Sequence, residues 1–219
     1  MKYSKEDIRR AMALYAVTDR SWLREGETLA DVCRNVLEHG ATFLQLREKE
    51  LDVESIQKEA RELKELCAAF HVPFVVNDSV ETALAVDADG VHVGQSDIQG
   101  RDIRALIGPD RILGMTARTG EEARAAEAAG ADYIGSGAVF GSSTKKNAKN
   151  LPLETLRDIC ASVSIPVVAI GGIGKENIRE LAGCGIAGAA VVSAVFGAED
   201  PGRAAEELLA LSREIIRHA

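Results

Sequence analysis

The stretch TFLQLREKELDVESIQKEARELKELCAAFHVPFVVND, residues 42–78, contains the repeating unit of the chain. Two short aliphatic runs, 42–46 and 73–76, lie on either side of a segment in which apolar residues recur every three or four positions. This spacing places the apolar residues on one face at the 3.6-residue period of an α-helix, so it predicts a helix over 53–70. A strand, a helix and a second strand in this order are typical of a parallel β/α/β unit.

The same alternation extends outward from this unit in both directions. Candidate strands cover 13–17, 42–46, 73–76, 89–93, 111–115, 132–136, 166–170 and 187–192. Candidate helices cover 28–39, 53–70, 79–86, 100–107, 119–129, 153–162, 175–183 and 201–217. Eight alternating pairs predict an α/β protein with a single (β/α)₈ TIM barrel, in one domain that spans residues 1–219. An open, doubly wound sheet is the alternative.

The composition argues against nucleic acid and membranes as binding partners. The 219 residues include 26 Lys and Arg against 34 Asp and Glu, a net charge of −8 that argues against a nucleic-acid-binding surface. No apolar run reaches the roughly 18 residues of a membrane span, and the start MKYSKEDIRR lacks the apolar segment of a signal peptide. The four cysteines form no C-x-x-C pair, which favours reduced thiols packed as small apolar groups. We therefore expect a soluble, cytoplasmic protein without nucleic-acid or membrane partners, and a homo-oligomer stays open.

Polar side chains follow the second candidate strand. Gln45, Arg47 and Lys49 alternate with leucines, so they share the face that a barrel turns toward its interior and mouth. Two cations in a confined site need an anion, and a guanidinium beside an ammonium suits phosphate. The alternative is an exposed strand end at which Glu48 and Glu50 neutralise the two cations.

Two carboxylates follow the next two strands. Asn77-Asp78 ends the third strand, and Asp97 lies in the loop after the fourth. Mg²⁺ typically binds one or two protein carboxylates and completes its shell with phosphate oxygens and water. Cations beside these carboxylates predict a metal–pyrophosphate site. The alternative is that Asp78 and Asp97 cap the helices that follow them.

A second anion site is predicted on the same rim. Barrels frequently bind phosphate at the loops after strands seven and eight, where this chain has Gly171-Gly172 and Val192-Ser193. The loop after strand six adds hydroxyls and a lysine at 142–145. His92, alone within a strand, is more typical of a hydrogen-bonded structural residue. A transferase that joins a pyrophosphate-bearing donor to a phosphate-bearing acceptor needs this arrangement of two anion sites.

Seven motifs together resemble one known family. They are YAVTD (15–19), QLREK (45–49), VND (76–78), DGVHVGQ (89–95) with Asp97, DYIG (132–135), TK (144–145) and AIGGI (169–173). In this order they are similar to thiamine phosphate synthases. The family is a (β/α)₈ barrel that joins 4-amino-2-methyl-5-hydroxymethylpyrimidine diphosphate to a thiazole phosphate and releases pyrophosphate.

The resemblance implies a role for each matching residue. Gln45, Arg47, Glu48, Lys49, Asn77 and Thr116 would bind the pyrimidine diphosphate, Asp78 and Asp97 would hold Mg²⁺, Lys145 would hold the diphosphate, and Ser142, Thr144, Gly172, Val192 and Ser193 would bind the thiazole phosphate. Arg47, Lys49, Lys145 and Thr116 would be the catalytic residues. The chain departs from the family at Thr116 and Arg118, where serine and histidine are usual, and at 141–145, where a proline is missing and Ser142 replaces threonine.

Three other functions remain open on the sequence alone. A thiazole tautomerase is a related barrel, but it would not need the diphosphate site that the cations and aspartates predict. A non-catalytic binder of thiamine precursors would be compatible with the departures at Thr116 and Arg118. A Schiff-base aldolase would need a lysine inside a strand, and the candidate strands contain none.

Overall fold

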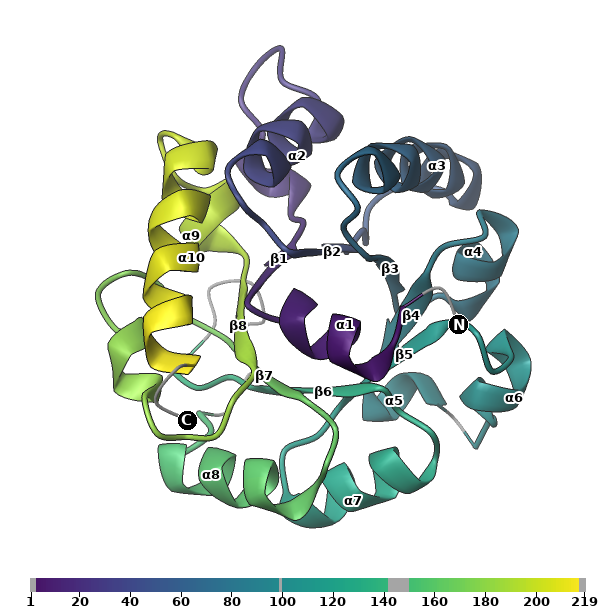
Figure 1. Ribbon diagram of the computed structural model, residues 1–219. Helices are drawn as coiled ribbons and strands as arrows, with labels where there is room; N and C mark the ends of the chain where they lie inside the picture. The colour runs from purple at the N-terminus through teal and green to yellow at the C-terminus, as the bar shows by residue number, and fades with distance from the viewer. Residues whose placement is uncertain (1–2, 99, 142–149, 217–219) are drawn as a thin grey trace.

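Eight parallel strands close into a barrel in the computed structural model, which describes residues 3–98, 100–141 and 150–216 (Figure 1). The strands are β1 (Leu14–Val17), β2 (Phe43–Leu46), β3 (Phe74–Asn77), β4 (Gly90–Val93), β5 (Ile112–Thr116), β6 (Tyr133–Gly137), β7 (Val167–Ile170) and β8 (Gly188–Val191). Each pairs with its sequence neighbour, and β8 pairs with β1. The predicted TIM barrel is confirmed, and the open sheet is wrong.

Helices surround the barrel on its outside (Figure 1). They are α2 (Leu29–Glu38), α3 (Val53–Ala69), α4 (Val80–Ala85), α5 (Gln95–Ile98), α6 (Ile103–Ile107), α7 (Gly120–Ala128), α8 (Leu153–Ser162), α9 (Ser193–Phe196) and α10 (Pro201–Ile216), with 3₁₀ turns η1 (Arg20–Trp22) and η2 (Ile178–Leu181). Asp52 and Thr119 cap α3 and α7 by accepting backbone N–H bonds.

The helix predicted over 175–183 is wrong, because only the 3₁₀ turn η2 forms there. The side chain of Asn177 donates to the carbonyl of Gly172 and accepts from the N–H of Gly174. This side chain therefore holds the preceding loop together, and regular structure starts only at Ile178. Five residues, 178–182, remain before the glycine at 183, and only the 3₁₀ turn η2 forms in them.

Alternating side chains divide the apolar core into two layers. On β2, Phe43 belongs to a cluster inside the barrel with Tyr15 and Tyr133, whereas Leu44 and Leu46 pack in the layer between strands and helices. Gln45 lies on the interior face with Phe43 and is only 5% exposed. The predicted orientation of this strand is confirmed.

A helix that the sequence analysis did not predict closes the amino end of the barrel. In Figure 1, α1 (Lys5–Ala11) lies across the barrel opening. Ser4 and Asp7 form a capping box that starts the helix. Ile8 and Met12 are fully buried in the interior cluster, so α1 fills the end of the barrel opposite the loops that follow the strands.

Replacing Ile8 with alanine is expected to lower the free energy of unfolding by about 2–4 kcal/mol, because the cavity would form beneath a helix that seals the core. Chemical denaturation measures the change. Glu6→Ala, on the exposed side of the same helix, is the matched control and should change stability by less than about 0.5 kcal/mol. Equal losses in the two variants would contradict a packing role for Ile8.

Cys33, Cys67, Cys160 and Cys184 form no disulfide. Burial raises the pKa of Cys33, Cys160 and Cys184, so these three thiols remain protonated and act as apolar groups. Across the described ranges, no helix has both the length and the apolar character required to cross a membrane.

Candidate active site

The first part of the site forms where β2, β3 and β4 end side by side. The register pairs Leu46 with Val76, and Asn77 with His92. Arg47 and Asp78 therefore leave adjacent strands at the same rim, and Asp97 follows from the third. Gln45 lies just below this rim inside the barrel. The structure thus brings to one edge the cations and carboxylates that the sequence analysis predicted together.

The backbone at Arg47 is fixed by the neighbouring strand. Its N–H donates to Thr18 Oγ1 over 3.0 Å, and the buried Thr18 lies at the end of β1. The guanidinium of Arg47 is partly exposed and forms no ion pair within the described parts of the chain. Lys49 is exposed. Both cations are therefore available for an anion at the mouth.

Glu48 shapes this loop. Its carboxylate is nearly buried and forms an ion pair with Arg20, whose other end reaches Glu59 at 2.7 Å. The second oxygen of Glu48 accepts the backbone N–H groups of Lys49 and Glu50. Glu48 therefore neutralises Arg20, and the alternative in which it neutralises Arg47 and Lys49 is not what the structure shows.

Burial and the charge of Arg20 shift the pKa values of Glu48 and Glu59 in opposite directions. Burial alone would raise the pKa of Glu48, but the bonds from Arg20 and from the loop N–H groups outweigh it and leave that pKa lowered. At Glu59 burial prevails over Arg20 and raises the pKa. Of the two carboxyl groups, Glu48 is the one held firmly as a carboxylate beside Arg20.

Glu48→Gln is expected to raise KM for the diphosphate substrate about three- to tenfold and to leave the fold intact. The amide keeps an oxygen for the two loop N–H groups but loses the charge that holds Arg20, so Arg47 and Lys49 become less well positioned. Steady-state kinetics measures it. Glu62→Gln, on the next turn of α3 after Glu59, is the control. An unchanged KM would contradict this positioning role.

Neither aspartate caps the helix that the alternative assigned to it. Ser79 caps α4, and Asp102 caps α6. Asp78 adopts the left-handed conformation with φ of 63°, and its N–H donates to the carbonyl of His92. Aspartate is one of the few residues besides glycine that adopt this conformation readily. Asp97 Oδ2 accepts the N–H of Gly94 at 2.8 Å, which holds its carboxylate at the end of β4.

The donor set at this rim matches a hard cation with an open coordination sphere. Among the described residues, no three His, Cys, Asp or Glu side chains gather as a metal cluster. A pair of aspartates on neighbouring strand ends is instead the kind of partial shell that Mg²⁺ uses when substrate phosphate and water supply the other ligands. Asp78 and Asp97 fit such a shell.

Inside the barrel, a row of hydrogen bonds connects the two sides of the mouth. It runs from Gln45 through Tyr15, Tyr133 and His92 to Thr116, with distances of 2.6, 2.7, 3.0 and 3.1 Å. His92 is thus hydrogen-bonded on both ring nitrogens, as the sequence analysis favoured. Tyr15 and Tyr133 both lie within the recognised motifs, but the motifs alone assign no role to either side chain.

The second part of the site forms where β7 and β8 end. Gly172 adopts φ of +64°, and a Cβ there would lie 2.5 Å from the carbonyl oxygen of Phe140, so only glycine fits. The Asn177 side chain holds this loop through its bonds to Gly172 and Gly174. Val192 and Ser193 are partly buried where α9 begins. The loop and the start of α9 belong to neighbouring strands, as a phosphate site between β7 and β8 requires.

Ser142, Thr144 and Lys145 lie outside the described residues, so their roles stay predictions. Arg118 is described, and its guanidinium donates to the carbonyl oxygen of Gly137 at the end of β6. At the position where the family usually has histidine, this chain therefore has a side chain that connects the segment after β5 to the end of β6.

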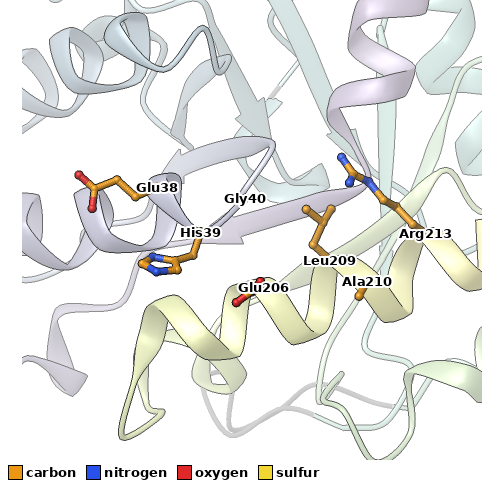
Figure 2. A pocket seen from close by; sticks show the side chains of 7 residues that line it. All are labelled: Glu38, His39, Gly40, Glu206, Leu209, Ala210 and Arg213. Carbon is orange, nitrogen blue, oxygen red and sulfur yellow. The ribbon is translucent and has the colours of Figure 1, made fainter.

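A surface pocket of about 370 Å³ lies away from this rim, between the end of α2 and the side of α10 (Figure 2). Glu38, His39 and Arg213 are among its lining residues. Because α2 ends before β2 begins, this pocket lies toward the amino ends of the strands. Catalytic residues of TIM barrels lie at the opposite end. None of the predicted site residues lines it.

The barrel and its rim define a class: a (β/α)₈ protein with cationic and carboxylate side chains at the ends of β2–β4 and a glycine loop at the end of β7. The family model described as thiamine monophosphate synthase matches residues 14–195. The chain belongs to this family.

Individual relatives match this chain over nearly its full length. It is 47% identical to a thiamine-phosphate synthase of Desulfitobacterium hafniense over 92% of this chain and 97% of that one. It is 44% identical to the thiamine-phosphate synthase of Methanobrevibacter smithii, over 90% of this chain and 94% of that one. The solved thiamine phosphate pyrophosphorylase of Pyrococcus furiosus superposes with a TM-score of 0.86 at 42% identity, over 95% and 99%.

Proposed function

We propose that this chain is the transferase that joins 4-amino-2-methyl-5-hydroxymethylpyrimidine diphosphate to a thiazole phosphate, forming thiamine phosphate and pyrophosphate. One observation carries the proposal: Arg47, Asp78 and Asp97 leave three adjacent strands at one rim, in a chain 47% identical to a thiamine-phosphate synthase. The substrates are small molecules, and Mg²⁺ is the expected cofactor.

The diphosphate is bound by charge. Arg47 offers a planar fork and Lys49 a mobile point charge, and both can neutralise the negative charge that develops on departing pyrophosphate. Lys145 is expected to add a third cation. Mg²⁺, held by Asp78 and Asp97, would supply further charge neutralisation at the leaving group. Gln45, Asn77 and Thr116 are then left to hold the pyrimidine ring.

The bond between the exocyclic CH₂ and the diphosphate oxygen breaks, and the electron pair leaves with pyrophosphate. The electron-rich aminopyrimidine can support the positive charge on the CH₂, and the thiazole nitrogen donates its lone pair to form the new bond. This nitrogen carries no proton that must be removed, so the reaction needs no strong general base. Gly172, Val192 and Ser193 are expected to hold the thiazole phosphate and to place the nitrogen near the CH₂.

The other candidate functions receive less support. A thiazole tautomerase would leave the cations and aspartates of the β2–β4 rim without a ligand. The relatives that match nearly the whole chain are named as synthases, which supports neither the tautomerase nor a non-catalytic binder. No lysine occurs in any of the eight strands, so a Schiff-base aldolase is also disfavoured.

The test is a mass-spectrometric assay with both substrates and Mg²⁺. We expect equal amounts of thiamine phosphate and pyrophosphate, no product when either substrate is omitted, and a loss of turnover with EDTA that added Mg²⁺ restores. Isomerisation of the thiazole phosphate without pyrophosphate release would contradict the proposal in favour of a tautomerase. A ligand-induced rise in Tm without any product would contradict it in favour of a binding protein.

A further inference from the structure

The row of hydrogen bonds inside the barrel has a defined polarity. Each phenol has one proton to donate, and burial raises the pKa of both Tyr15 and Tyr133, so neither ionises near neutral pH. Gln45 donates an amide N–H to Tyr15. If Tyr15 also accepted from Tyr133, its own proton would lack an acceptor in this row of bonds, and a buried donor without a partner is costly.

The bonds therefore run in one direction. Tyr15 donates to Tyr133, and Tyr133 donates to Nδ1 of His92. A neutral imidazole that accepts at Nδ1 carries its proton on Nε2, so His92 donates to Thr116 Oγ1. Thr116 then has its own proton left for another acceptor. The side-chain oxygen of Gln45 is likewise left to accept a bond, because the nitrogen of that amide is bound to Tyr15.

We propose that Tyr15, Tyr133 and His92 are positioning residues that present Gln45 as a hydrogen-bond acceptor and Thr116 as a donor to the pyrimidine. The inference rests on the proposed function and deepens it, since it assigns a basis for selecting the substrate. A ring that carries an amino group matches an acceptor at Gln45. An analogue with an oxo group at the same position would place two acceptors against each other, a mismatch that a rigid site rejects.

A glycine on a neighbouring strand makes room for this row of side chains, although glycine weakens a strand. A Cβ at Gly114 on β5 would lie 2.1 Å from Cζ and 2.3 Å from the hydroxyl oxygen of Tyr133. Glycine inside a strand weakens it and often marks a close approach. The rings are also packed together, with centroids 5.8 Å apart for Tyr15 and Tyr133 and 5.5 Å for His92 and Tyr133. Neither phenol can swing to another partner without disturbing the interior cluster.

The reverse polarity requires two coordinated changes. If the Gln45 amide turned over, Tyr15 would donate to its oxygen, every bond in the row would invert, and His92 would carry its proton on Nδ1. Gln45 would then present a donor to the ring. The amide orientation and the His92 tautomer are therefore coupled. Tyr133→Phe removes the link, because Tyr15 loses its acceptor and can then donate to a Gln45 amide that has turned over.

Two measurements test the inference. The first is nitrogen-15 NMR of the His92 imidazole without substrate, which distinguishes the two neutral tautomers. We expect the Nε2-protonated tautomer in the unaltered protein. The Nδ1-protonated tautomer would overturn the polarity.

The second measurement compares kcat/KM for the 4-amino pyrimidine diphosphate with that for its 4-oxo analogue. We expect the unaltered protein to favour the amino compound at least about a hundredfold, and Tyr133→Phe to reduce this ratio about tenfold, chiefly through KM. Tyr3→Phe removes a phenol hydroxyl outside the row and is the matched control, with an unchanged ratio.

A Tyr133→Phe variant that loses both activities equally and keeps the unaltered tautomer would overturn the inference, because a purely structural role predicts that pattern. If Tyr133→Phe fails to fold, Tyr15→Phe breaks the row one bond earlier and should also reduce the ratio. No turnover of the amino compound by the unaltered protein would contradict the proposed function instead. The tautomer, which is measured without substrate, would still decide the polarity.

Discussion

Asp97→Asn is expected to lower kcat about a hundred- to a thousandfold and to raise the Mg²⁺ concentration needed for half-maximal turnover. The reason is charge rather than shape. Asparagine keeps an oxygen that can accept the N–H of Gly94, so the start of α5 should be preserved. It lacks the negative charge that attracts the cation to the rim. Turnover measured across a Mg²⁺ titration separates the two effects.

Asp102→Asn is the matched control for this variant. Asp102 caps α6 a few residues further along the chain, and asparagine caps helices about as well as aspartate. Its turnover and Mg²⁺ dependence should both remain at the level of the unaltered protein. If Asp97→Asn also retained both, the assignment of Asp97 to the metal would be contradicted.

Arg47→Ala is expected to lower kcat/KM for the pyrimidine diphosphate about a thousandfold, with both a higher KM and a lower kcat. The guanidinium should bind the diphosphate in the ground state and neutralise the charge that grows as the bond breaks. Arg47→Lys should restore only part of the loss, because an ammonium cannot form the paired bonds of a planar fork.

Stability should be unaffected by Arg47→Ala, which makes the kinetic result easy to interpret. The backbone N–H that anchors residue 47 to Thr18 is retained, and within the described ranges the Arg47 guanidinium has no ion pair to lose. Arg203→Ala, which removes an exposed pair with Glu207 on α10, is the control. A fall of less than fivefold in kcat/KM for Arg47→Ala would contradict its proposed role.

The sequence predicted the barrel because strands and long helices have clear periodicity. Each predicted strand overlaps the observed one to within about a residue at each end, and the helix over 53–70 is present as α3. The short helix α1 contains one buried apolar residue, Ile8, and Met12 follows as its C-cap, so no periodic signal reveals the helix. The segment 175–183 does not form the predicted helix because the Asn177 side chain forms hydrogen bonds with Gly172 and Gly174 of the preceding glycine loop.

The site residues that directly follow a strand could be predicted from the sequence. Arg47, Asp78 and Asp97 each follow a strand end, so a barrel places them on one rim once the strands are recognised. Arg20 and the Tyr15–Tyr133 pair could not be found in this way. Arg20 reaches Glu48 across 28 positions in the chain, and the two phenols are 118 positions apart, so only the closed barrel brings them together.

The most direct test of the central claim is a crystal structure with Mg²⁺ and an unreactive analogue of the pyrimidine diphosphate. The account predicts that the diphosphate lies at the carboxyl ends of β2–β4, with Arg47 on one side and a metal held by Asp78 and Asp97 on the other. A diphosphate bound at the amino end of the barrel, with Arg47 and Asp97 both free of ligand and metal, would contradict it.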